Sequence, residues 1–110
     1  MPIYNKLVRD RIPEIIENSG EKFSTRILGN EEYITELQKK AYEELEEYIG
    51  TETLEDAIEE LADLLEIVHS LAESHGSSIQ EVEKVRKQKA AKRGGFKDKI
   101  FLIEVEDEEG

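Results

Sequence analysis

Apolar residues follow a helical spacing along two long segments of this chain and alternate loosely along two short ones. Residues 31–49 and 54–74 place apolar side chains three or four positions apart, which predicts two long helices. Residues 22–28 and 99–105 carry β-branched and aromatic side chains, which predicts two short strands that pair in a small sheet. The expected fold is therefore mainly α, with two short β-strands beside the helices.

Glycine, proline and capping residues predict two further helices. A short helix is expected over residues 11–18, with Pro13 tolerated in its first turn. A helix rich in lysine and arginine is expected over residues 79–93, and Gly94-Gly95 end it. All four helices are preceded by residues whose side chains accept hydrogen bonds from a first helical turn. The expected caps are Asp10, Asn30, Thr53 and either Ser77 or Ser78.

The second long helix carries apolar residues over a wider arc than the single stripe of a surface helix. With a turn of about 100° per residue, its leucine, isoleucine, valine and alanine side chains cover about 220° of the circumference. A chain of 110 residues has few other helices to cover such an arc. The pattern therefore predicts burial of this helix against a second subunit.

Acidic residues are concentrated on the same two long helices. Residues 31–66 contain fourteen acids and two bases, a net charge of −12. The acids include two clusters, Glu43-Glu44-x-x-Glu47 on the first helix and Glu60-x-x-Asp63 on the second. The simplest interpretation is a solvated surface. The alternative is a site for a divalent cation, because ligand sets made of oxygen alone suit Mg²⁺ or Mn²⁺.

The angular position of Glu60 favours the metal site. Glu60 falls inside the apolar arc of its helix, and Asp63 falls at the edge of that arc. A carboxylate among leucine and isoleucine must be paired, protonated or bound to a metal. On the first helix, Glu44 borders the apolar stripe and Glu47 follows along one side. Two such helices packed antiparallel can bring four carboxylates to one place.

Composition and charge limit the class of protein to which this chain can belong. A single domain is expected over residues 1–110, with 106–110 as a frayed tail. The absence of cysteine excludes a disulfide framework and thiolate chemistry. No apolar signal or membrane segment is visible, so a soluble cytoplasmic protein with no membrane partner is expected. The net charge of −12 argues against nucleic-acid binding through bulk charge.

Basic residues are concentrated near the C-terminal end. Residues 84–99 carry eight bases and one acid, a net charge of +7. Within them Lys89 and Arg93 are neighbours at i, i+4 and Lys92 lies beside Arg93, so the helix is a candidate phosphate clamp. The alternative is a solvated face that balances the acidic helices.

Glu66-Ile67-Val68-His69 matches the Glu-x-x-His element of di-iron helical bundles. That architecture needs two such elements, and this chain has one. Glu66 and His69 also fall on the far side of their helix from Glu60. A di-iron site is therefore not expected.

The two acidic clusters and the two ends of the chain together resemble the MazG-like all-α nucleotide pyrophosphohydrolase superfamily. Its signature, E-E-x-x-E, a spacer and then E-x-x-D, is similar to Glu43-Glu44-Leu45-Glu46-Glu47, twelve residues, and Glu60-Leu61-Ala62-Asp63. The start of the chain, residues 4–13, and the stretch Lys92-Arg93-Gly94-Gly95-Phe96 resemble the phosphoribosyl-ATP pyrophosphohydrolase-like branch. The resemblance covers nearly the whole chain, and it does not establish phosphoribosyl-ATP as the substrate.

The resemblance implies a helical bundle assembled as a homodimer or homotetramer. It implies a Mg²⁺-dependent enzyme, with Mn²⁺ as the alternative metal, that cleaves a nucleoside triphosphate between its α and β phosphates. The products would be a nucleoside monophosphate and pyrophosphate, as in clean-up of the nucleotide pool. The implied metal ligands are Glu44, Glu47, Glu60 and Asp63. The expected substrate-binding residues are Lys6, Arg9, Lys89, Lys92 and Arg93.

The general base of this expected reaction is Glu43 or Glu47, because a carboxylate not fully engaged by metal can take the proton of the attacking water. The competing hypothesis is a non-catalytic helical interaction module in which the acids are surface charge. Stabilisation by Mg²⁺ would separate the two, since a ligand that binds only the folded state raises its stability. No residue identifies the base or sugar of a nucleotide substrate.

Overall fold

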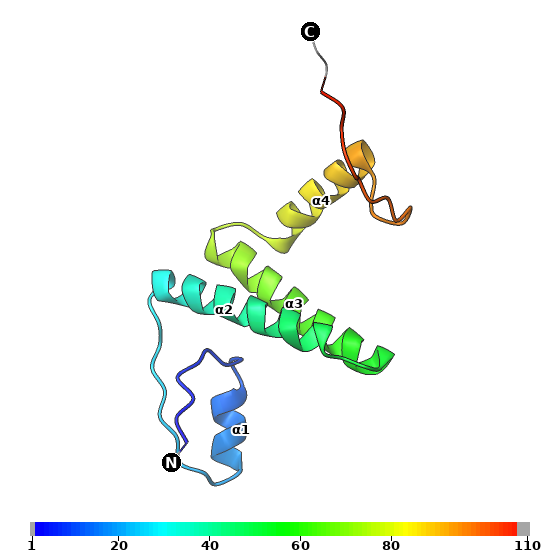
Figure 1. Ribbon diagram of the computed structural model, residues 1–110. Helices are drawn as coiled ribbons and strands as arrows, with labels where there is room; N and C mark the ends of the chain where they lie inside the picture. The colour runs from blue at the N-terminus through cyan, green and yellow to red at the C-terminus, as the bar shows by residue number, and fades with distance from the viewer. Residues whose placement is uncertain (1, 108–110) are drawn as a thin grey trace. The chain divides into compact units, whose positions relative to one another are not determined.

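The described part of the chain is all α-helical. The computed structural model describes residues 2–107, and these contain four helices, shown in Figure 1. Their bounds agree with the sequence-based expectation to within one residue at each end. The helices are α1 (Ile12–Asn18), α2 (Asn30–Ile49), α3 (Leu54–Ser74) and α4 (Ile79–Arg93).

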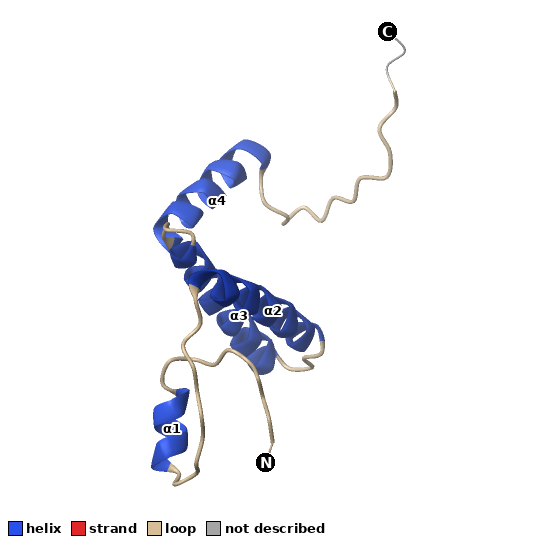
Figure 2. Ribbon diagram, turned by 90° about the vertical axis from the view of Figure 1, so that its left-hand side faces the viewer, coloured by secondary structure: helices blue, strands red, loops and turns tan. Residues whose placement is uncertain are grey.

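The prediction of two short strands is wrong. Residues 22–28 and 99–105 are loops in Figure 2, because within residues 2–107 neither segment has a partner strand with which to exchange backbone hydrogen bonds. The first segment is held by a side chain instead. Arg26 forms a two-point ion pair with Glu32 of α2, with Nη1 at 3.0 Å from Oε1 and Nη2 at 2.6 Å from Oε2. β-branched and aromatic residues favour a strand only where a neighbouring strand is present for them to pack against, and the pattern alone does not provide that neighbour.

The chain divides into two compact units, residues 1–79 and residues 80–110. In the first unit α2 and α3 lie side by side, and residues 50–53 reverse the chain between them (Figure 1). These two helices therefore form an antiparallel hairpin. Its buried apolar side chains are those of Leu37, Ile67 and Ala72.

The helix starts show which cap predictions hold. The Oγ1 atom of Thr53 accepts a hydrogen bond of 3.1 Å from a backbone N–H in the first turn of α3, which confirms this cap. The caps predicted at Asp10 and Asn30 are wrong. Arg11 and Gly29 occupy these cap positions, and neither provides a capping side-chain hydrogen bond. The cap predicted at Ser77 or Ser78 stays a prediction.

The outer face of α3 remains open in this chain. Leu54 is 76% exposed, Ile58 is 57% exposed and Leu65 is 53% exposed. Packing against α2 thus covers only part of the apolar arc that the sequence shows. The predicted second subunit stays a prediction, and this exposed apolar surface is its physical motivation.

The second unit consists of most of α4 and the segment that follows it. Gly94 ends α4 with φ of +81°, a left-handed backbone conformation that strains residues with a Cβ atom. The expected helix stop is therefore confirmed. The predicted frayed tail falls partly on residues 108–110, which lie outside the described residues. None of the described helices is both long and apolar enough to cross a membrane.

Candidate metal centre

Three carboxylates converge between α2 and α3. Glu44, Glu47 and Glu60 each offer an oxygen atom, and these three atoms lie within 4.8 Å of one another. Glu44 and Glu47 are three residues apart and share one face of α2. Glu60 faces them from α3, because the apolar arc in which it lies is turned partly toward α2. The hairpin thus brings together three of the four predicted metal ligands.

Two of these carboxylates hold a buried oxygen without a hydrogen-bond donor. The Oε2 atoms of Glu44 and Glu60 are both buried, and neither has a partner among the described residues. Within the same part of the chain, no lysine or arginine forms an ion pair with any of the three acids. A buried, unpartnered carboxylate oxygen is unfavourable, so the arrangement requires a proton or a cation.

The proton affinity of the three acids, here called the carboxylate triad, reflects this requirement. Hydrogen bonding of the protonated Glu60 carboxyl to Glu44, and then to Glu47, raises the pKa of Glu60 to about 7, and desolvation and charge repulsion act in the same direction. Burial is the main cause that raises the pKa of Glu44. A divalent cation placed among the three oxygens would replace the shared proton and satisfy both buried atoms. The residues present therefore fit Mg²⁺ or Mn²⁺.

Asp63, the fourth predicted ligand, lies outside the triad. Its Oδ1 atom accepts a hydrogen bond of 2.6 Å from Nη2 of Arg9, a residue expected to bind substrate. The two side chains are 40% and 59% exposed, so solvent screens the pair and its contribution to stability is about 0–1 kcal/mol. No sequence pattern pointed to this contact, because the partners are 54 residues apart.

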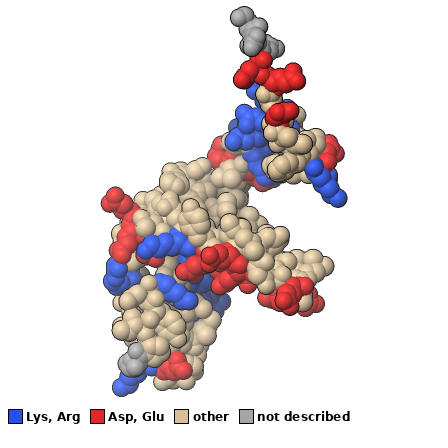
Figure 3. All heavy atoms as spheres, in the orientation of Figure 1, with Lys and Arg blue, Asp and Glu red and all other residues tan. Residues whose placement is uncertain are grey.

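The remaining predicted residues of the first unit also lie outside the triad. Glu43 is exposed on α2. Lys6 places its Nζ atom 5.8 Å from the ring centroid of Tyr4, a cation–π distance. On the face drawn in Figure 3, acidic and basic atoms of this unit adjoin one another. The N-terminal segment thus brings positive charge to the neighbourhood of an acidic helix, as the Arg9–Asp63 pair shows.

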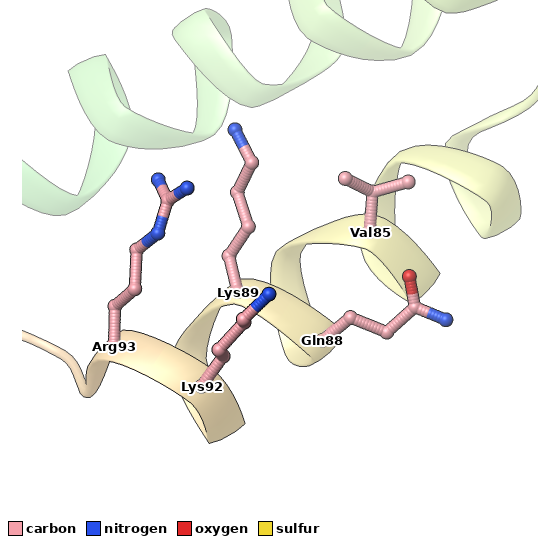
Figure 4. Close-up of a pocket in the computed structure, with 5 residues that line it drawn as sticks. All are labelled: Val85, Gln88, Lys89, Lys92 and Arg93. Atoms are coloured by element: carbon pink, nitrogen blue, oxygen red, sulfur yellow. The ribbon is translucent and has the colours of Figure 1, made fainter.

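The predicted basic residues of α4 line a surface pocket within residues 80–110. Figure 4 shows Lys89 and Arg93 projecting to the same side of the helix, one turn apart. Within the described residues, the side chains of these two and of Lys92 form no hydrogen bond or ion pair, whereas the side chain of Arg86 is paired with Glu83 at 2.9 Å. The pocket has a volume of about 340 Å³ and is lined by Val85, Gln88, Lys89, Lys92 and Arg93.

A second pocket, of about 610 Å³, adjoins the C-terminal turn of α4. Its lining adds Arg86 and Phe96, neither of which the sequence analysis named as a substrate-binding residue. The lining of the first pocket could have been grouped from the sequence by helical spacing. Gln88 and Lys89 lie three and four residues after Val85 and therefore share one helix face with it. For Phe96 the sequence signal was its place after two glycines, at the end of the stretch that resembles the phosphoribosyl-ATP pyrophosphohydrolase-like branch.

No protein-family model matches the chain, and no solved structure matches it. A protein of Mycolicibacterium smegmatis, described only as uncharacterized, is 43% identical over 54 residues. The match covers 49% of this chain and 55% of the relative, so the chain spans about half the length of the protein that it matches. This similarity identifies a relative and carries no statement of activity.

Proposed function

We propose that this protein is a divalent-metal-dependent nucleoside triphosphate pyrophosphohydrolase of the MazG-like type, cleaving between the α and β phosphates. The observation that carries the proposal is the carboxylate triad Glu44, Glu47 and Glu60, with its two buried and unpartnered oxygens. The E-E-x-x-E and E-x-x-D motifs supply the same residues in the expected order. A solvated acidic face does not account for buried oxygens without donors.

The triad has the chemistry that such a reaction needs. A divalent cation bound there supplies positive charge to a triphosphate that carboxylates alone would repel, and it lowers the pKa of a bound water. Glu44 and Glu60 would hold the ion through their buried oxygens. Glu47 is the more exposed member, and it or Glu43 would take the proton of the attacking water. Asp63 would join the ligands once released from Arg9.

The basic pocket on α4 suits the phosphate groups of the substrate. Lys89, Lys92 and Arg93 are exposed and have no acidic partner among the described residues, so their donors are available to phosphate oxygens. Positive charge near a leaving pyrophosphate stabilises the negative charge that develops on it. These three residues are therefore proposed to bind substrate phosphates.

The exposed apolar surface of α3 favours a second hypothesis, a helical interaction module without turnover. Leu54 and Ile58 would then be partner contacts and the triad a remnant that binds metal or nucleotide. The two hypotheses differ in one measurable property, which is metal-dependent release of pyrophosphate from a nucleoside triphosphate.

The test measures pyrophosphate and nucleoside monophosphate formed from a panel of canonical and damaged nucleoside triphosphates, with Mg²⁺ and with EDTA. We expect Mg²⁺-dependent formation of both products. Glu47→Gln should lower kcat/KM by roughly 100-fold or more, the effect of losing a general base or metal ligand. Glu46→Gln is the matched control, since Glu46 lies on the same helix outside the triad. No turnover with any substrate, or equal rates for the two variants, would support the interaction module.

A further inference from the structure

An aromatic ring stands beside the basic residues at the end of α4. Phe96 is 99% exposed, and it lines the pocket of about 610 Å³ together with Lys89 and Arg93. The same two cations also line the smaller pocket, and they project to one side of the helix (Figure 4). An apolar ring in water gains free energy when it is covered, and a flat aromatic partner covers it best. The larger pocket thus combines one aromatic surface with two positive charges.

Backbone hydrogen bonds within residues 80–110 hold Phe96 in this place. The N–H of Gly94 donates to the carbonyl of Ala90 at 2.8 Å, and the left-handed φ of +81° at Gly94 turns the chain at the helix end. The N–H of Lys99 donates to the carbonyl of Phe96 at 3.1 Å, which closes a tight turn after the ring. Phe96 therefore lies on a short segment that is fixed on both sides.

Gly95 leaves space for a ligand beside the ring. Its φ is negative, so its backbone conformation does not demand a glycine. A Cβ atom at this position would meet no other atom of the described chain within 4 Å, so packing does not demand a glycine either. The absence of a side chain allows a ligand to approach the backbone closely. A bound ligand gives a reason for this glycine that the fold does not.

These neighbours suit the two parts of a nucleotide. The side chains of Lys89 and Arg93 form no ion pair among the described residues, so their donors are available to phosphate oxygens. Every nucleobase has a flat π face that can stack on an aromatic side chain. We propose that the larger pocket binds a nucleotide, with its base stacked on Phe96 and its phosphates held by Lys89 and Arg93. The choice of a nucleotide as the ligand rests on the proposed function.

The same pocket predicts weak selection among the bases. The side chains that line it offer hydrogen-bond donors from arginine and lysine, and none of them offers an acceptor. The edge of each nucleobase presents both donors and acceptors, so these side chains cannot match the edge of any one base. Stacking tolerates all bases. We therefore expect a broad class of nucleotides in which the ring holds the base and the cations hold the phosphates.

Single-stranded nucleic acid carries the same two chemical groups and is the alternative ligand. Its many phosphates would be repelled by a chain with a net charge of −12. The lining of the pocket also contains a single aromatic residue, whereas single-strand binding uses successive rings for successive bases. A mononucleotide is therefore the favoured ligand, and an oligonucleotide is the competitor in the test.

Calorimetric titration of the full chain in Mg²⁺ buffer tests the stacking. The probe is an ATP analogue with a methylene group between the α and β phosphorus atoms, which prevents cleavage there. Phe96→Ala should weaken its binding by roughly 5- to 100-fold, the effect of losing one base–aromatic stack. Phe96→Tyr keeps the ring and should bind within about two-fold of the natural chain. Phe101→Ala is the matched control, because Phe101 is 88% exposed and lies outside both pockets.

A ligand without a base separates stacking from charge. Inorganic tripolyphosphate should bind to the natural chain and to Phe96→Ala with equal affinity, whereas Arg93→Ala should weaken the binding of both ligands. The proposal is overturned by an absence of analogue binding, by an unchanged affinity in Phe96→Ala, or by an equal loss for the two ligands. Tighter binding of an eight-nucleotide single strand than of the analogue would also overturn it. A preference above about 100-fold between adenine and cytosine analogues would contradict weak base selection.

Turnover separates this proposal from the proposed function. Analogue binding that depends on Phe96, without turnover of any nucleoside triphosphate, would support the stacking site and contradict the enzyme. Mg²⁺-dependent turnover with an unchanged KM in Phe96→Ala would support the enzyme and overturn the stacking site. Loss of the fold does not confuse these results, because Phe96 is 99% exposed and no residue of α4 is buried within the described chain.

Discussion

At Glu60 the folded chain holds a proton more tightly than an unfolded chain does. The pKa of this carboxyl is about 7 in the folded state against an ordinary value of 4.5, with its contacts to Glu44 and Glu47 as the main cause. An acid whose pKa is raised by folding stabilises the folded state fully below its unfolded pKa. That stability is lost as the pH rises toward the folded pKa. In EDTA we therefore expect the free energy of unfolding to fall between about pH 4.5 and pH 7.

Glu60→Gln should remove most of this pH dependence, measured by urea unfolding in EDTA across the same range. The variant should keep or gain metal-free stability, because a repelling carboxylate is gone, and it should lose stabilisation by Mg²⁺. Glu59→Gln, an exposed neighbour on α3, is the control and should behave as the natural chain. Full Mg²⁺ affinity together with a large loss of metal-free stability in Glu60→Gln would place the metal elsewhere.

The contact between Arg9 and Asp63 would compete with a metal ion for the Asp63 carboxylate. Arg9→Gln releases the Asp63 carboxylate, whose Oδ1 lies 2.6 Å from Nη2 of Arg9, and removes a nearby positive charge. We expect Mg²⁺ to bind a few-fold more tightly, with a change in the free energy of unfolding below about 1 kcal/mol because the pair is exposed. Calorimetric titration measures the affinity. Arg11→Gln, which breaks only the 3.3 Å pair with Glu14, is the control.

The opposite outcome for Arg9 is equally informative. A raised KM with unchanged Mg²⁺ affinity would indicate that Arg9 binds substrate, as first expected from the sequence. The structure shows Arg9 engaged with Asp63.

Among the elements, α4 differs from the others because its cations outnumber its acids and three of them lie in one pocket. Arg93→Ala should lower kcat/KM by roughly 10- to 100-fold, the loss expected for one charge-assisted hydrogen bond to phosphate. The helical content should not change, because no residue of α4 is buried within the described chain. Lys84→Ala is the control, since it removes a cation from the same helix outside both pockets. Equal kinetics for the two variants would indicate a solvated face.

For the whole molecule, the exposed apolar surface of α3 predicts self-association. Ile58 is 57% exposed in the single chain and would be covered in the expected dimer. Ile58→Asp should weaken that dimer, because association would then bury a charged side chain in place of an apolar one. Sedimentation equilibrium and the concentration dependence of the Tm measure this effect. Ile27→Asp makes the same change at a loop residue that is 95% exposed, and it should leave association unchanged. A folded natural monomer at micromolar concentration would contradict the prediction.

The sequence by itself determined the helices of this protein and the identity of the acids between them. Apolar spacing, glycine stops and the Thr53 cap are local signals, and all four helices form where these signals predicted. The placement of Glu60 within an apolar arc is also a local feature, because it follows from the helical turn and the residues of one helix. The same local reasoning failed for residues 22–28 and 99–105, because a strand needs a partner that neighbouring residues do not specify.

Only the tertiary structure decided which acids meet. Packing of α2 against α3 brings oxygen atoms of Glu44, Glu47 and Glu60 within 4.8 Å of one another, while the N-terminal segment pairs Arg9 with Asp63, which is not part of the triad. Both contacts join residues far apart in the chain, and their strength depends on burial and on distance. Charge patterns in the sequence fix neither quantity, so the sequence could nominate the acids and their chemistry, while the helix packing selected the three that converge.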